Sequence, residues 1–527
     1  MTTNTPAHAI GSALAAAGVR YLFGMPGGGN NLDVIEACEA AGVAFVLAHT
    51  ETGAAIMASA YGELTDTVGA CVVTRGPGAA SAVNGAAQAQ QDRQPLLIIA
   101  DTVDQASSAR IAHQNIDQRA MFAPVTAWST TLGTTEPEEV MRDAIRVAST
   151  PPRGAVHLDV DPSYTGREPA PGAGPAQGSL SDARELIAKA SRPVILAGVG
   201  ARGHAAAIRA LVAGTSIPVL MTYKAKGVVP DSGPNSGGSF TGARTDGRVL
   251  TEADLIITLG LDSIELIPNP WPYAAPVLAL TEARDPYRYL EPDVTVVGPL
   301  APLIAALPEL GDDWPTGFGT QHRLAVERGL LSGPVPASGL APWRVVREVR
   351  AAAAATSVAT VDAGAHMLVV MPLWSTEAPG QVLISSGLAT MGYAVPAAIG
   401  AALARPEVRV YCFVGDGGLQ MCLGELETIA RLGLAITVVV FNDRTLSLIK
   451  AKQRPNGHGG LGAVQYTETD FALVAAGMGI ASTAVQTEAE LAVALLASEP
   501  GPHLLDVRVN ADSYRHVIEV VRNGVLD

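Results

Sequence analysis

The stretch from residue 408 to residue 443 reads VRVYCFVGDGGLQMCLGELETIARLGLAITVVVFND, with two apolar runs and an aspartate just after each. The runs Val408–Val414 and Ala435–Phe441 are almost continuously hydrophobic, which is typical of strands covered on both faces of a parallel sheet. Between them, apolar residues recur at helical spacing. A right-handed crossover then returns the second strand parallel to the first. The stretch therefore predicts a strand–helix–strand unit of a doubly wound α/β fold.

The two aspartates, Asp416 and Asp443, are expected at the carboxyl edge of this sheet, where open α/β folds bind ligands. The first lies in Gly415-Asp416-Gly417-Gly418, whose small residues allow backbone N–H groups to approach a phosphate. Two carboxylates beside such a turn suit Mg²⁺, which shares its coordination shell with phosphate oxygens. A solvated loop aspartate is the alternative for Gly-Asp-Gly alone. The second aspartate, 27 residues later, favours a metal site.

Composition limits the class of protein. With 527 residues, two to four domains are expected. Apolar residues make up 48% and charged residues 16%, which indicates a compact globular chain. The net charge of −15 argues against nucleic acid and anionic membranes as partners. There is no apolar run long enough to span a bilayer, and the N-terminus does not resemble a signal peptide. The four scattered cysteines favour small core residues in a reducing, cytoplasmic setting over a disulfide framework.

Strand patterns alternate with helical patterns in three blocks, which we place at residues 1–165, 183–310 and 343–527. Two Pro/Gly-rich stretches, Asp161–Asp182 and Gly311–Pro342, separate them as linkers, the second with room for a short helix. The pattern predicts three domains, each a doubly wound parallel sheet.

The first block carries a second group of candidate residues. Glu51 follows the run Val43–Ala48 and opens a helical stretch, a position where glutamate is also favoured by the helix dipole alone. Glycine-rich segments follow two other runs of the block, at residues 24–28 and 74–78. All three should gather at one sheet edge.

Together these motifs resemble the signature of thiamine diphosphate enzymes, and most closely the acetolactate synthase group. In that family Gly-Asp-Gly and a later Asn-Asp or Asn-Asn hold Mg²⁺ and diphosphate. The resemblance implies that Asp416, Asp443 and the carbonyl of Thr445 are the protein's metal ligands. Many members have Asn at the second position, so Asp443 departs from the pattern while keeping an oxygen donor.

The same resemblance makes the three blocks a pyrimidine-binding, a central and a diphosphate-binding domain. It implies that Glu51 hydrogen-bonds the aminopyrimidine ring and activates the cofactor. Gln114 would reach the reactive face of the cofactor, and His113 could assist proton transfer, although a loop histidine is often merely exposed. The cofactor-binding residues implied by the family motifs are Pro26, Gly27, Glu51, Pro77, Gly364, Ala365, His366, Ala389, Met391, Gly415, Asp416, Gly417, Gly418, Asp443, Thr445, Leu446 and Ser447.

Arg75 departs from acetohydroxyacid synthases, which have a small residue at that position. Its guanidinium could pair with a substrate carboxylate, or it could point to a surface acid. The central block lacks the Arg-Phe-Asp-Asp-Arg stretch that accompanies FAD in anabolic relatives, so FAD is not expected.

The resemblance implies an enzyme that uses thiamine diphosphate and Mg²⁺ to decarboxylate a 2-oxo acid such as pyruvate and ligate it to a carbonyl acceptor. A non-ligating decarboxylase, an aldehyde lyase or ligase, and a catalytically lapsed cofactor-binding paralogue are the alternatives. Family architecture implies a homodimer, or a dimer of dimers, with shared active sites.

Overall fold

The computed structural model describes residues 5–105, 107–172, 174, 178–266, 269–285, 289–453, 462–496 and 500–524. These residues form two compact units. One comprises residues 1–173, 387–407 and 421–436, and the other residues 174–386, 408–420 and 437–527. The units contain three parallel sheets of six strands each, which confirms the predicted fold class.

The N-terminal sheet has the strand order β2-β1-β3-β4-β6-β5. Its strands are β1 (Tyr21–Met25), β2 (Ala44–Leu47), β3 (Gly69–Val73), β4 (Leu96–Asp101), β5 (Trp128–Leu132) and β6 (Ala155–Val160). Its helices are α1 (Pro6–Ala16), α2 (Asn30–Ala40), α3 (Glu51–Thr65), α4 (Pro77–Gln91), α5 (Gln118–Phe122) and α6 (Pro137–Ser149). Helices α1, α2 and α6 share a buried core with one face of the sheet, to which Leu22 belongs. The next residue, Phe23, points the opposite way and contacts Tyr61 of α3, with 6.0 Å between ring centroids. The inner strands β3, β4 and β6 are thus buried on both faces, as expected of strands inside a parallel sheet.

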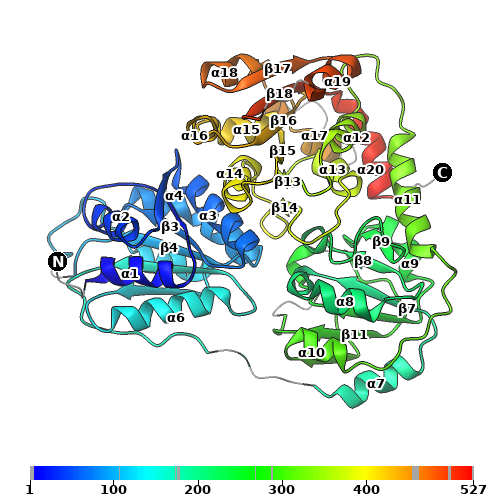
Figure 1. Ribbon diagram of the computed structural model, residues 1–527, viewed down its shortest axis with the longest axis horizontal. Helices are drawn as coiled ribbons and strands as arrows, with labels where there is room; N and C mark the ends of the chain where they lie inside the picture. The colour runs from blue at the N-terminus through cyan, green and yellow to red at the C-terminus, as the bar shows by residue number, and fades with distance from the viewer. Residues whose placement is uncertain are drawn as a thin grey trace. The chain divides into compact units, whose positions relative to one another are not determined.

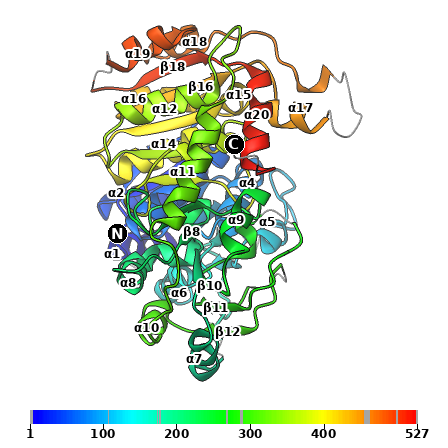
Figure 2. The same ribbon diagram turned by 90° about the vertical axis from the view of Figure 1, so that its right-hand side faces the viewer.

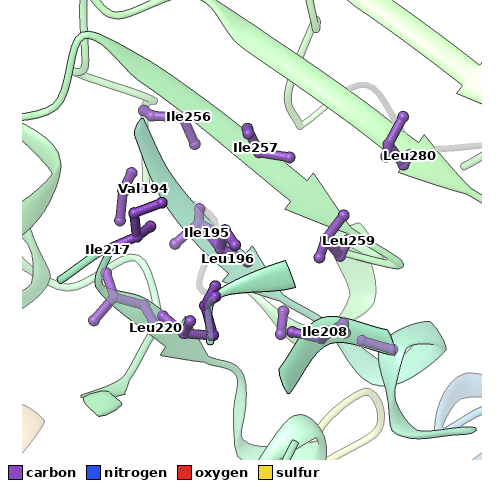
Figure 3. Close-up of a cluster of buried hydrophobic side chains, with 14 of the residues drawn as sticks. Val194, Ile195, Leu196, Ile208, Ile217, Leu220, Ile256, Ile257, Leu259 and Leu280 are labelled. Carbon is purple, nitrogen blue, oxygen red and sulfur yellow. The ribbon is translucent and has the colours of Figure 1, made fainter. Parts of the chain in front are cut away.

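The central sheet has the order β12-β11-β10-β7-β8-β9. Its strands are β7 (Pro193–Ala197), β8 (Val219–Met221), β9 (Ser236–Ser239), β10 (Leu255–Leu259), β11 (Val277–Thr281) and β12 (Val294–Val297). Its helices are α7 (Leu180–Ala188), α8 (Ala205–Leu211), α9 (Gly247–Leu250) and α10 (Leu300–Ala305). Figure 3 shows aliphatic side chains of β7, β8 and β10 packing with Ile208 of α8. Counted from β7, the strand order is 3-2-1-4-5-6, which is that of dinucleotide-binding folds.

The C-terminal sheet has the order β14-β13-β15-β16-β18-β17, which repeats the topology of the N-terminal sheet. Its strands are β13 (Val358–Val361), β14 (Val382–Ile384), β15 (Val410–Gly415), β16 (Ile436–Asn442), β17 (Ala481–Val485) and β18 (His503–Arg508). Helices of this part of the chain are α12 (Pro342–Ala352), α13 (Met367–Leu373), α14 (Ala394–Ala404), α15 (Asp416–Met421), α16 (Glu425–Arg431), α17 (Ser447–Gln453), α18 (Phe471–Gly477), α19 (Glu488–Leu496) and α20 (Tyr514–Val521). Helices α12, α13, α19 and α20 share the hydrophobic core of one sheet face.

Two sequence expectations need correction. The stretch expected as the second linker contains α11 (Phe318–Leu331), a helix of 14 residues that runs beside α20 (Figures 1 and 2). It is anchored there because the ring of His516 lies 2.8 Å from the Gly329 carbonyl. The turn expected at residues 415–418 is instead the last residue of β15 followed directly by the first residues of α15.

Helix α14 packs closely against α3 within the first unit. A Cβ atom at Gly400 of α14 would lie 2.3 Å from the carbonyl oxygen of Met57 in α3, so only glycine permits this approach. All four cysteines are buried free thiols, which agrees with their expected role as core residues. Among the described residues, none of the helices combines the length and apolar character needed to cross a membrane.

Candidate active site

The predicted metal ligands lie at the carboxyl ends of β15 and β16, two neighbouring strands of the C-terminal sheet. Asp416 is buried, and its carboxylate accepts the backbone N–H groups of Gly417 at 2.7 Å and of Arg444 at 2.5 Å. Arg444 has a φ of +61°, which turns its N–H toward Asp416. Arg444 therefore joins the loop of Asp443 to the start of α15, where Asp416 lies.

Asp443 is fixed by its own loop. One carboxylate oxygen accepts the Thr445 N–H at 3.0 Å, and the other accepts the Ser447 hydroxyl at 2.5 Å. Burial raises the pKa of Asp443 to about 7, and the charge of Asp416 adds to this effect. A carboxylate whose ionisation is opposed by a neighbouring carboxylate favours a bound cation that would compensate both charges. The Thr445 carbonyl accepts the Ser447 N–H at 2.8 Å, and its second lone pair can serve a metal.

The glycines beside Asp416 have a packing role that the sequence did not reveal. A Cβ at Gly418 would lie 2.4 Å from the carboxylate of Asp362, at the end of β13, and one at Gly417 would lie 3.1 Å from Leu446 and Tyr466. Asp362 was missed because it follows its strand without a recognisable motif. Its buried carboxylate places a third acidic group at this edge.

His366 lies at the same edge, beyond β13. Its ring is buried, stacks on Phe441 with 5.5 Å between centroids, and covers Gly364 and Gly415, where added Cβ atoms would lie 2.7 and 3.4 Å away. Burial lowers the pKa of His366 to about 4. Its Nε2 atom has no hydrogen-bond partner among the described residues. A buried polar atom without a partner is costly and indicates a polar ligand.

These residues fit a Mg²⁺-diphosphate group. Carboxylate and carbonyl oxygens are the ligands that Mg²⁺ prefers, and it keeps open positions for phosphate oxygens and water. Among the described residues, no group of three or more His, Cys, Asp or Glu side chains could hold a metal by itself. A site of two aspartates and a backbone carbonyl agrees with that finding, because the remaining ligands would come from phosphate.

The second group of candidates lies at the carboxyl edge of the N-terminal sheet. Glu51 is the first residue of α3, whose N-cap Thr50 accepts the Gly53 N–H at 2.9 Å. A Cβ at Gly78 would lie 3.1 Å from Oε1 of Glu51, so the carboxyl group reaches the first turn of α4. Gly27 lies close to Thr74 as well, since a Cβ added at Gly27 would be 2.2 Å from the Thr74 hydroxyl oxygen. The three motifs do converge, with Pro26 and Pro77 exposed beside them.

Glu425 supports Glu51 and was missed at the sequence level. Its carboxylate is fully buried and accepts the backbone N–H groups of His49 at 3.0 Å and Thr50 at 3.2 Å, and the Thr428 hydroxyl at 2.8 Å. Burial raises its pKa. The partners are more than 370 residues apart, so no local pattern could have revealed this anchor of the turn before α3.

Gln114 is near this edge, and His113 is not fixed there. Gln114 has a φ of +56°, and an added Cβ at Gly76 would lie 2.9 Å from its Cβ and its carbonyl oxygen. Gln118 secures the loop, since it accepts the Gly76 N–H at 2.8 Å and donates to the Asp101 carbonyl at 3.0 Å. The side chain of His113 is exposed and makes no hydrogen bond with a described residue, so its catalytic role stays a prediction.

Ala389 and Met391 belong to a segment that packs along α4. The Gly387 N–H donates to Asp92, just beyond α4, at 2.9 Å, and Thr390 lies 3.4 Å from Asn84. Ala389 has a φ of +52°, which places its backbone in the left-handed region. The segment runs from the end of α4, at Asp92, to its middle, at Asn84, whereas Glu51 meets the first turn. Gly78 and Asn84 are about 9 Å apart at the helical rise.

Comparison with known proteins matches the three blocks in order. Residues 4–121 match the Thiamine pyrophosphate enzyme, N-terminal TPP binding domain; residues 180–307 match the central domain; and residues 362–507 match the C-terminal TPP binding domain.

Similar whole proteins include the acetolactate synthase of Bacillus subtilis (strain 168), which is 30% identical over 97% of this chain and 94% of its own length. The acetolactate synthase isozyme 1 large subunit of Escherichia coli (strain K12) is 29% identical over 96% and 94%. The catabolic acetolactate synthase of Raoultella terrigena is 29% identical over 95% and 94%. The chain belongs to the thiamine diphosphate-dependent enzymes, in their acetolactate synthase-like group.

Proposed function

We propose that this enzyme uses Mg²⁺ and thiamine diphosphate to decarboxylate a 2-oxo acid such as pyruvate and to join the remaining acyl unit to a second carbonyl compound. One observation carries this proposal. Asp416 and Asp443 lie together at one edge of the C-terminal sheet, and Glu51 lies at the topologically equivalent edge of the N-terminal sheet. When bound, thiamine diphosphate supplies the electron sink for loss of CO₂.

We assign the following roles to residues of the chain. Asp416, Asp443 and the Thr445 carbonyl hold the metal, and His366 faces the diphosphate. Glu51 hydrogen-bonds the aminopyrimidine ring. The remaining residues implied by the family motifs, from Pro26 to Ser447, line the cofactor.

We further propose that each active site is shared between two copies of the chain in a dimer or a dimer of dimers. Support comes from the family resemblance, which implies that the pyrimidine-binding domain of one chain meets the diphosphate-binding domain of another.

The absence of FAD also belongs to the proposal. In dinucleotide-binding folds, phosphate binds at the glycine-rich turn after the first strand of the sheet. Here the corresponding turn follows β7, and the Val199 N–H donates to the carboxylate of Glu265 at 2.8 Å. The other oxygen of Glu265 accepts the Thr222 hydroxyl at 2.5 Å. A carboxylate of the chain thus takes the place that a phosphate would need.

A non-ligating 2-oxo acid decarboxylase is the second candidate, because His113 is exposed and no described contact fixes an acceptor-side acid or base. Product analysis separates the two. The full chain is incubated with thiamine diphosphate, Mg²⁺ and a panel of 2-oxo acids, with a Glu427→Gln variant as a matched surface control. Acetolactate from pyruvate would support ligation, acetaldehyde alone would support the second candidate, and the absence of any cofactor-dependent product would contradict both.

A further inference from the structure

Arg75 is held at the carboxyl edge of the N-terminal sheet by a buried carboxylate. Its Nη1 atom lies 3.9 Å from Oδ2 of Asp101, at the end of the neighbouring strand β4. The Arg75 side chain is 30% exposed, whereas that of Asp101 is 2% exposed. The guanidinium therefore has one side toward a buried counter-ion and another side accessible from the edge. This excludes the alternative that Arg75 only pairs with a surface acid.

Asp101 is enclosed by the glycine-rich loop after β1. Its Oδ1 atom accepts the side-chain amide of Asn30 at 3.0 Å and the Asn30 N–H at 3.4 Å. Its Oδ2 atom is buried and accepts no hydrogen bond from a described residue. Gly29, with a φ of +77°, makes room for this oxygen, since a Cβ there would lie 2.7 Å away. Burial raises the pKa of Asp101, and the Arg75 charge opposes that rise.

A buried carboxylate with one oxygen lacking a hydrogen bond is expensive unless a charge compensates it. Arg75 supplies that charge, and Asp101 in return limits where the guanidinium can lie. The pair is thus arranged to position a cation at the edge, which a solvated surface arginine would not require.

The loop of Arg75 runs between the two predicted catalytic residues. The next residue, Gly76, packs against Gln114, and Gly78 faces the carboxyl group of Glu51 at 3.1 Å from an added Cβ. Arg75 therefore lies in the short turn between β3 and α4, next to the residues that contact Gln114 and Glu51. An arginine here can bind a carboxylate with two parallel hydrogen bonds.

The chemistry decides which carboxylate gains from this contact. A guanidinium paired with the leaving carboxylate of the donor would stabilise the ground state more than the transition state, in which that charge is lost, and would slow the reaction. The acceptor's carboxylate keeps its charge throughout. We propose that Arg75 binds the carboxylate of an acceptor 2-oxo acid and that Asp101 is its positioning residue; this rests on the ligase function proposed above.

For pyruvate as donor and acceptor, two pyruvate anions and one proton give one acetolactate anion and one CO₂. The donor's C1–C2 bond breaks, a bond forms between the donor C2 and the acceptor C2, and the proton ends on the acceptor oxygen. The acceptor carboxylate survives in the product, so Arg75 can hold it from binding to release of the product.

The test compares two acceptors that differ only in this group. Pyruvate serves as donor, and 2-oxobutanoate competes with propanal, which has hydrogen in place of the carboxylate. The ratio of 2-ethyl-2-hydroxy-3-oxobutanoate to 3-hydroxypentan-2-one is measured by mass spectrometry. Arg75→Met should lower this ratio by ~10- to 100-fold, the effect of one charge-assisted interaction. Arg75→Lys keeps the positive charge and loses the planar guanidinium. Its product ratio should lie between those of the wild type and Arg75→Met.

Asp101→Asn tests the positioning role, because it removes the negative charge and keeps nearly the same side-chain shape. This substitution should lower the same product ratio and raise KM for 2-oxobutanoate. In the double variant it should add little to the effect of Arg75→Met, because both substitutions disrupt the same Arg75–Asp101 pair. Arg142→Met, at an exposed arginine of α6, is the matched control and should leave the ratio as in the wild type. Thermal melting of each variant reports folding independently.

An unchanged product ratio in Arg75→Met would overturn the inference, and so would additive effects of the two substitutions. If the wild-type enzyme ligates neither acceptor, the proposed function itself fails. If it ligates both and Arg75→Met does not discriminate between them, only the role of Arg75 fails.

Discussion

At the scale of single residues, Glu51 is the side chain whose role can be tested most cleanly. It opens α3, and its carboxyl group faces the first turn of α4. Glu51→Gln should slow exchange of the cofactor's C2 proton by ~10²- to 10⁴-fold, the usual contribution of a positioned acid–base group. The cofactor should still bind, because the proposed metal and diphosphate ligands lie on another sheet.

Exchange is followed by proton NMR in deuterated buffer, with thiamine diphosphate and Mg²⁺ added to the full chain. Glu427→Gln, a partly exposed glutamate of α16, is the control. Wild-type exchange in Glu51→Gln would remove Glu51 from the activating role.

Some site residues could be predicted from sequence because strand, turn and polar residue lie together. Asp416, Asp443 and Glu51 each follow a recognisable apolar run. Glu425 and Asp101 could not be predicted, since each depends on partners brought close only by the fold. Asn30, for example, is 71 residues from Asp101 in the chain.

At the scale of elements, the contact between α3 and α14 depends on one glycine. In Gly400→Ala the new methyl group would lie 2.3 Å from the Met57 carbonyl, so the helices must separate. Such overpacking costs about 1–3 kcal/mol, and the melting temperature should fall by several degrees. Gly477→Ala at the end of α18 is the control, because nothing lies within 4 Å of its added Cβ. Equal melting temperatures for the two variants would contradict this packing.

The turn after β7 should make stability depend on pH. Burial raises the pKa of Glu265 from 4.5 to about 7, so the folded chain retains a proton that the unfolded chain releases. This stabilisation is fully present below pH 4.5 and is lost as pH rises to about 7. Between pH 5 and pH 8, the wild type should therefore lose more stability than Glu265→Gln, by up to about 3 kcal/mol.

Calorimetric melting of both proteins across this range provides the measurement. Glu252→Gln, at an exposed glutamate of the same domain, should follow the wild-type curve. A Glu265→Gln variant that also follows the wild-type curve would show that Glu265 does not change its proton affinity on folding.

Element prediction from sequence succeeded where apolar runs are continuous. The apolar runs Val408–Val414 and Ala435–Phe441 agree with β15 and β16 to within two residues at each end. The expected linker around α11 was only partly right, because that helix buries residues such as Leu330 in a core shared with α20, which is distant in the sequence. In the sequence, α11 reads as a polar stretch that contains glycines, which is also typical of a linker.

At the scale of the whole molecule, the central expectation is a pair of chains with shared sites. A heterodimer of one Glu51→Gln chain and one Asp443→Ala chain would then contain one doubly defective site and one intact site. It should recover about half of the wild-type activity per dimer, since a two-fold dimer has two equivalent sites. The heterodimer is purified through two different affinity tags, and the homodimers of each variant are the controls. Activity no higher than that of the homodimers would place each site within one chain.

Titration calorimetry of thiamine diphosphate into the full-length chain, with Mg²⁺ and with EDTA, tests the cofactor assignment most directly. We expect saturable binding of one cofactor per chain with Mg²⁺, loss of binding in EDTA, and at least ~10-fold weaker binding in Asp443→Ala, because a proposed metal ligand is removed. Asp512→Ala, an exposed aspartate, should bind as the wild type does. No binding to the wild type, or equally tight binding to Asp443→Ala, would contradict the proposed site.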